Sequence, residues 1–157
     1  MDKREIIQGF EAARAKTFVY MAQALISELG EVKGRKKIIE TVRMMSKSSG
    51  EEARAYYIEH GLEPSWKNHR ESNAQVYSLA WDGGVIVDEP DRKIVEYSYC
   101  PLGDAFTKLG RSAEELGDLY CDVTDNAFWS SFNPEWIVTR MKSFSKDGVC
   151  RLVWLKS

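Results

Sequence analysis

Three cysteines and two closely spaced aspartates are the residues in this chain best suited to chemistry. Cys121, Asp122 and Asp125 fall within one short stretch, while Cys100 precedes them and Cys150 follows them. A thiolate can attack an electrophilic carbon, and a carboxylate can hold a cation or transfer protons. A nucleophilic thiol needs a lowered pKa, and no histidine neighbours any of these cysteines in the sequence. The more common role for each thiol is that of a small buried hydrophobic group.

A long helix is predicted from Ser112 to Phe132, and it would carry the central thiol and both carboxylates. Ser112 and Glu115 have the form of a capping box, and Asn133-Pro134 would end the helix. At about 100° per residue, one face of this helix is apolar and is expected to pack on a sheet. That face carries Leu116, Tyr120, Val123 and Ala127.

The opposite face of the same helix combines groups of different kinds. It carries Asp118, Cys121, Asp122, Asp125, Phe128, Trp129 and Phe132. Carboxylates, a thiol and aromatic rings on one side indicate a pocket wall or an interface. An alternative is a solvated acidic face whose aromatic residues close the helix end, because exposed charge is common on proteins. Another is a dimer contact made by Phe128, Trp129 and Phe132.

The first part of the chain has a helical period. One helix is predicted from Glu5 to Leu29, and a second follows Gly34. Ser48-Ser49-Gly50 interrupts the pattern, and Ser49 with Glu52 has the form of a capping box. A third helical segment is therefore expected from Glu51 to His60.

The later segments alternate like strands and are separated by turn residues. Strands are predicted at 77–81, 85–87, 93–99, 136–144 and 149–155. Asp82-Gly83-Gly84 and Ser145-Lys146-Asp147-Gly148 are expected to form turns, the second within a C-terminal hairpin. The fold class is therefore α+β, with N-terminal helices and an antiparallel sheet of about four strands. The long helix is inserted before the hairpin.

Composition narrows the possible roles of the chain. It has 157 residues, 43% hydrophobic and 29% charged, which suits a single domain over residues 1–157. The formal net charge of −2 gives no basic footprint for nucleic acid. No apolar run is long enough to cross a bilayer and no signal peptide is visible, so a cytoplasmic location with reduced thiols is expected.

No metal or other cofactor is expected. The three cysteines lack the close C-x-x-C pairing of zinc modules, and a fourth ligand would have to be His60, His69 or an aspartate. Glycine-rich phosphate loops and zinc-protease motifs are absent from the sequence.

An ordered set of segments resembles the L-2-amino-thiazoline-4-carboxylic acid hydrolase family over residues 95–153. The segments are Tyr99–Phe106, Leu116–Asp122 with Asp125, Phe132-Asn133-Pro134, Thr139–Phe144 and Asp147–Cys150. The chain departs from the family pattern at Arg151, where the family often has Asp.

The resemblance implies hydrolytic opening of a cyclic isothiourea to a carbamoyl-cysteine. Asp122 and Asp125 would hold the amidinium or shuttle protons, and Cys121 or Cys100 would attack the ring. Arg140 would bind the substrate carboxylate in a forked geometry. Aromatic groups expected at the substrate are Tyr99, Trp129 and Phe132.

An alternative to the hydrolase is a non-catalytic small-molecule sensor, because the layout also resembles 4-vinyl reductase-type domains. Aromatic enrichment suits a pocket in both cases. A homodimer is possible under either function.

Overall fold

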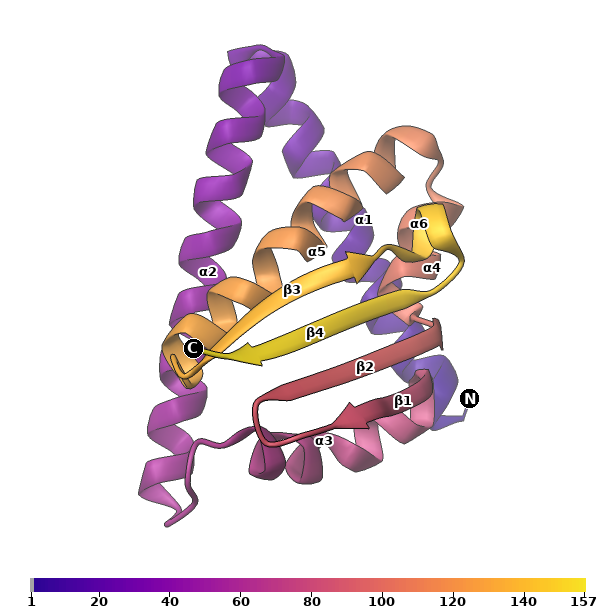
Figure 1. The fold of residues 1–157 in the computed structure, drawn as a ribbon. Coiled ribbons are helices and arrows are strands. Elements are labelled where there is room, and N and C mark those ends of the chain that lie inside the picture. Colours follow the sequence, from indigo (N-terminus) through magenta and orange to yellow (C-terminus); the bar gives the residue numbers. More distant parts are fainter. Residues whose placement is uncertain (1) are drawn as a thin grey trace.

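A four-stranded antiparallel sheet with all its helices on one side forms the framework of the chain (Figure 1). The computed structural model describes residues 2–157. The strands stand in the order β1-β2-β4-β3. Their bounds are β1 Asp82–Asp88, β2 Arg92–Tyr99, β3 Trp136–Lys142 and β4 Cys150–Lys156. The expected α+β class and the four-stranded antiparallel sheet are confirmed.

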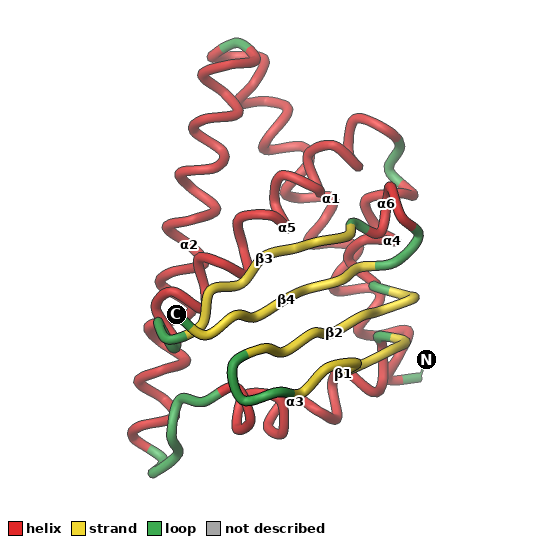
Figure 2. Tube along the Cα trace, in the orientation of Figure 1, coloured by secondary structure: helices red, strands yellow, loops and turns green. Residues whose placement is uncertain are grey.

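Helices from both halves of the chain cover the sheet. They are α1 Lys3–Leu29, α2 Glu31–Glu59, α3 Trp66–Ala80, α4 Pro101–Lys108, α5 Arg111–Phe132 and α6 Phe144–Asp147. Helix α5 packs along α2 on one side and against β3 on the other. A loop at residues 60–65 joins α2 to α3 (Figure 2). None of the helices within residues 2–157 is long and apolar enough to cross a membrane.

Two apolar clusters stabilise this arrangement, and α5 contributes to both. The first lies among α1, α2, α4 and α5, and it includes Val19, Val42, Phe106, Leu116 and Tyr120. The second lies between the sheet and the ends of α2, α3 and α5, and it includes Tyr57, Trp66, Val95, Trp129, Phe132 and Trp154. The region of α5 between the two clusters carries Cys121 and Asp125.

The predicted interruption at Ser48-Ser49-Gly50 is wrong, because α2 continues through it. The Ser49 hydroxyl donates to the carbonyl of Met45 at 3.1 Å, which is a bond that a helix interior tolerates. Gly50 lies where α5 crosses α2, and a Cβ there would stand 2.3 Å from the Phe128 carbonyl oxygen. The glycine therefore permits close helix packing and does not end the helix.

The predicted strand at 77–81 is also wrong, since these residues close α3. Tyr77 and Trp81 are four residues apart, and their rings meet edge to face at 5.4 Å. Gly83, expected in a turn, lies within β1 with φ +127°, and a Cβ there would stand 2.2 Å from the Glu96 carbonyl oxygen. Close approach of β2 therefore accounts for this glycine.

Helix α5 is confirmed, but it turns the other face to the sheet. Leu116 and Tyr120 pack among α1, α2 and α4, while Asn126 on the other side donates to the carbonyl of Val138 in β3 at 2.9 Å. The predicted Ser112–Glu115 capping box does not form, because Gly110 is the N-cap and makes no side-chain cap bond. The face with Cys121 and Asp125 therefore looks toward the sheet.

The β3–β4 connection is longer than a tight hairpin turn. Residues Phe144–Asp147 form the short helix α6, which ends at Gly148 in the left-handed conformation. This helix lies beside α4 (Figure 1). Its Ser145 and Lys146 side chains contact Asp118 of α5.

Candidate active site

A cavity of about 440 Å³ lies between the sheet and helices α1, α2, α3 and α5. Its aromatic lining consists of Tyr77, Trp81, Tyr97, Tyr120, Phe128, Trp129 and Trp154. Its titratable lining consists of Glu11, Arg14, His69, Arg70, Cys100, Cys121, Asp125, Arg140 and Cys150. The predicted pocket beside α5 is thus present, and polar groups from several elements converge on it.

Asp125 on α5 faces this cavity with an unpartnered carboxylate. Across residues 2–157, no hydrogen bond or ion pair is made to its side chain. Burial raises the pKa of Asp125 to about 6, while the positive charges of Arg140 and Arg14 act in the opposite direction. Asp125 is therefore mostly ionised at neutral pH and is free to accept hydrogen bonds from a ligand.

Asp122 takes a different role although it lies one helical turn away. Its side chain is 58% exposed and accepts a 2.8 Å bond from Nε of Arg140. It does not line the cavity. The helix thus separates the two predicted carboxylates: Asp125 lies inside and Asp122 lies at the surface.

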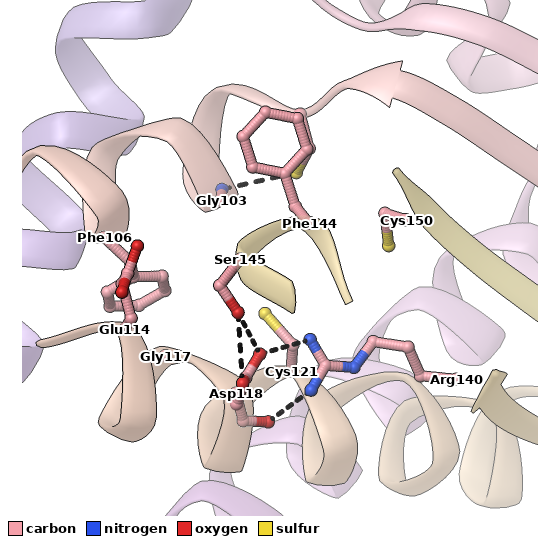
Figure 3. A pocket seen from close by; sticks show the side chains of 11 residues that line it. Gly103, Phe106, Glu114, Gly117, Asp118, Cys121, Arg140, Phe144, Ser145 and Cys150 are labelled. Atoms are coloured by element: carbon pink, nitrogen blue, oxygen red, sulfur yellow. Dashed lines mark hydrogen bonds and ion pairs between the residues drawn. The ribbon is translucent and has the colours of Figure 1, made fainter. Parts of the chain in front are cut away.

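Arg140 extends from β3 and reaches the cavity, but Asp118 and Asp122 of α5 hold its guanidinium; Figure 3 shows the bonds to Asp118. Besides the bond to Asp122, Nη1 donates to Asp118 Oδ1 at 3.0 Å and Nη2 donates to the Asp118 carbonyl at 2.9 Å. The Arg140 side chain is only 8% exposed. It therefore joins β3 to α5, and few of its donors remain for a substrate carboxylate.

Asp118 extends this network to α6 (Figure 3). Its carboxylate accepts from the Ser145 hydroxyl at 3.1 Å and lies 3.0 Å from Lys146 Nζ. Burial acts to raise the pKa of Asp118, but the bonds from Lys146 and Arg140 outweigh it and the pKa is lowered. The charged Asp118 therefore fastens α6 and β3 to α5.

All three cysteines line the cavity, and they also line a crevice of about 30 Å³ beside α6. Burial raises the pKa of Cys121 well above its ordinary value and that of Cys150 to about 12. The pKa of Cys100 is raised as well, again by burial, although its Sγ accepts from the Gly103 N–H at 3.4 Å. All three side chains are therefore neutral thiols at pH 7.

Of the three aromatic residues predicted to contact the substrate, only one lines the cavity. Trp129 lines the cavity, whereas Phe132 is fully buried in the core with its ring edge-on to Tyr57. Tyr99 also lies away from the cavity: its hydroxyl accepts from Gln8 at 3.0 Å and donates to Asp104 at 3.2 Å. Because Trp129 and Phe132 fill the chain's own core, they are not an exposed dimer contact.

Helix α3 supplies cavity residues that the sequence reasoning missed. Arg70 donates from Nη1 to the Tyr97 hydroxyl at 2.7 Å, and its guanidinium lies 4.6 Å from the centre of the Tyr77 ring. Burial, followed by the charge of Arg70, lowers the pKa of His69 to about 4, so this imidazole is neutral at pH 7. In the sequence, the helical spacing of His69, Arg70, Asn73 and Tyr77 could have indicated that they share one face of a helix.

The chain thus has an α+β fold with a partly open cavity between its sheet and helices, on which aromatic and polar side chains converge. Residues 11–154 match the family model described as L-2-amino-thiazoline-4-carboxylic acid hydrolase, and the chain belongs to that family. A comparison with curated proteins found no match.

A solved structure with a similar fold is that of a trafficking protein particle complex subunit 3 from Naegleria fowleri, covalently bound to palmitic acid. The two chains are 12% identical with a TM-score of 0.57, and the match covers 94% of this chain and 95% of that chain. At this identity the likeness shows a shared fold alone.

Proposed function

We propose that this protein hydrolyses a cyclic isothiourea, 2-aminothiazoline-4-carboxylate or a close analogue, to a carbamoyl-cysteine. Family membership supports the substrate class. The observation that carries the proposal is Asp125, an ionisable carboxylate that lines a cavity rich in aromatic side chains and has no partner among residues 2–157. An amidinium has the charge and N–H groups to satisfy such a carboxylate.

Asp125 has two tasks in the proposed reaction. One carboxylate oxygen accepts a hydrogen bond from the amidinium, which places the flat ring among aromatic side chains such as Trp81 and Trp129. The other oxygen takes a proton from a water molecule as the water oxygen bonds to the amidine carbon. A bond from this carbon to a ring heteroatom then breaks, and the proton goes to the departing atom. The net reaction consumes one water molecule.

The proposal assigns the attack to water because the nearby sulfur groups are neutral thiols. Burial raises the pKa of Cys121 and Cys100, the two cysteines expected to attack. A neutral thiol is a weak nucleophile, whereas water beside a carboxylate of pKa about 6 has a base ready at neutral pH.

Mass spectrometry of the reaction mixture tests the proposal. The purified protein is incubated with 2-aminothiazoline-4-carboxylate, and the product is expected to gain the mass of one water molecule. Asp125→Asn should lower kcat/KM by about 100-fold or more, because a positioned general base contributes at least that factor. Asp122→Asn is the matched control and should retain turnover within about tenfold, because Asp122 lies outside the cavity.

Two results would contradict the proposed hydrolysis. One is the absence of any ring-opened product with the unmodified protein. The other is equal turnover by Asp125→Asn and the unmodified protein, which would remove the carboxylate from the reaction. Circular dichroism of each variant separates loss of function from loss of folding.

A second candidate function is ligand binding without turnover. The aromatic side chains on the cavity wall favour it, as does the fold shared with a subunit that holds palmitic acid. In this case, the purified protein should release an apolar molecule on denaturation, detectable by comparing native and denatured mass spectra. A ligand-free protein that opens the aminothiazoline ring would exclude this candidate.

A further inference from the structure

Two oppositely charged groups on the cavity wall lack a counter-ion. Asp125 makes no ion pair, and Arg70 has no carboxylate within ion-pairing distance among residues 2–157. Half-buried charges are costly unless a partner replaces the lost water. A ligand that carries a cationic and an anionic group would supply both partners at once.

The two charged groups come from different elements of the cavity wall, Asp125 from α5 and Arg70 from α3. Tyr77 on α3 and Tyr97 on β2 contact Arg70 and also line the cavity. The volume of about 440 Å³ is that of a small-molecule site, so one ligand can be offered both charges.

Arg70 is the cavity cation with most hydrogen-bonding capacity left. Arg140 is held by Asp118 and Asp122, and Arg14 is bound to Glu11 and to the Tyr120 hydroxyl. Arg70 uses one N–H on the Tyr97 hydroxyl, and its guanidinium lies over the Tyr77 ring, 4.6 Å from the ring centre. Its remaining N–H groups form a fork that matches a carboxylate.

We propose that Arg70, held by Tyr77 and Tyr97, is a carboxylate subsite that makes the cavity selective for compact ligands bearing an amidine and a carboxylate. This inference rests on the proposed function for the amidine half of the ligand. In this proposal the substrate carboxylate is bound by Arg70 on α3, and not by Arg140 on β3, as the sequence had led us to expect.

Binding of inert probes tests the subsite without relying on turnover. The probes are 2-aminothiazole-4-carboxylate and 2-aminothiazole, aromatic rings that differ only in the carboxylate. Calorimetry on the unmodified protein should show about 10- to 100-fold tighter binding of the carboxylated probe, as expected for charged hydrogen bonds. Arg70→Gln should abolish this preference, and Arg70→Lys should retain only part of it. Arg43→Gln, on the exposed side of α2, is the control and should keep the full preference.

The ratio of the two dissociation constants within one variant is unaffected by a smaller folded fraction, so weakened folding does not imitate the expected result. The subsite is overturned if the unmodified protein binds neither probe or binds both equally, or if Arg70→Gln weakens both by the same factor. The unmodified protein could instead prefer the carboxylated probe, lose this preference in Arg70→Gln, and yet not hydrolyse the aminothiazoline. The Arg70 subsite would then stand, and the proposed hydrolysis would be wrong.

Discussion

Asp122 and Asp125 show how one helical turn changes the role of a carboxylate. Asp122 is at the surface and engaged by Arg140, whereas Asp125 faces the cavity and burial raises its pKa to about 6. If ionised Asp125 is the base, kcat/KM should rise with pH through about 6 and then level off. A rate profile from pH 4.5 to 8 checks this expectation. A rate that does not change across this range would argue against a titrating base.

The raised pKa of Asp125 also predicts a pH-dependent gain in stability for Asp125→Asn. Below the ordinary pKa of 3.8, both states of the native chain hold the proton, so the variant gains nothing. As pH rises from 3.8 to about 6, the unfolded chain releases this proton while the folded chain still holds it, so the native chain loses stability until both states are ionised. At pH 7.5 the variant should be more stable by on the order of 2–3 kcal/mol.

Urea unfolding of both proteins at pH 4 and pH 7.5 measures this difference. The titration of His69 occurs in both proteins and cancels in the comparison. A variant that is less stable than the native chain at pH 7.5 would show that the Asp125 carboxylate has a stabilising partner.

The neutral thiols predict slow alkylation. Because burial raises the pKa values of Cys100, Cys121 and Cys150, iodoacetamide at pH 7.5 should modify the folded protein far more slowly than the unfolded one. Intact mass spectrometry over time gives both rates. Rapid modification of Cys121 in the folded protein would instead support its predicted role as a nucleophile.

At the scale of single elements, the absence of a side chain at Gly50 allows α2 and α5 to pack closely. Gly50→Ala should lower the free energy of unfolding by about 1–3 kcal/mol, because the added Cβ would meet the Phe128 carbonyl. Gly9→Ala in α1 is the matched control: nothing lies within 4 Å of its Cβ position, and it should stabilise by roughly 0.5–1 kcal/mol. Thermal unfolding compares the two. Equal effects would mean that α2 and α5 do not pack closely at Gly50.

The sequence allowed the four strands and the helices α1, α2 and α5 to be located, but α3, α4 and α6 were not predicted. Alternation at 77–81 is too short to separate a strand from a helix end, and the long-range packing that settles it is not visible in one sequence. Missing α3 also meant missing Arg70 and His69. Gly50 shows the same limit, since its reason lies on a different helix.

At the scale of the whole molecule, α5 was the part of the site that sequence could locate. Its period placed Cys121 and Asp125 on one face, and the structure turns that face toward a cavity. The wall contributed by α1, α2 and α3 depends on how distant segments pack, so composition and spacing could not reveal it. The predicted homodimer remains a prediction.

The most direct test of the account is a carbon-13 NMR titration of the Asp125 carboxyl group, with and without 2-aminothiazoline. We expect an apparent pKa of about 6 in the free protein, and a pKa lower by at least about one unit with ligand bound, because a bound cation favours the carboxylate. Asp125→Asn identifies the resonance. An ordinary pKa near 4 in the free protein, or a pKa that does not change when ligand is added, would contradict an unpartnered carboxylate that binds the amidine.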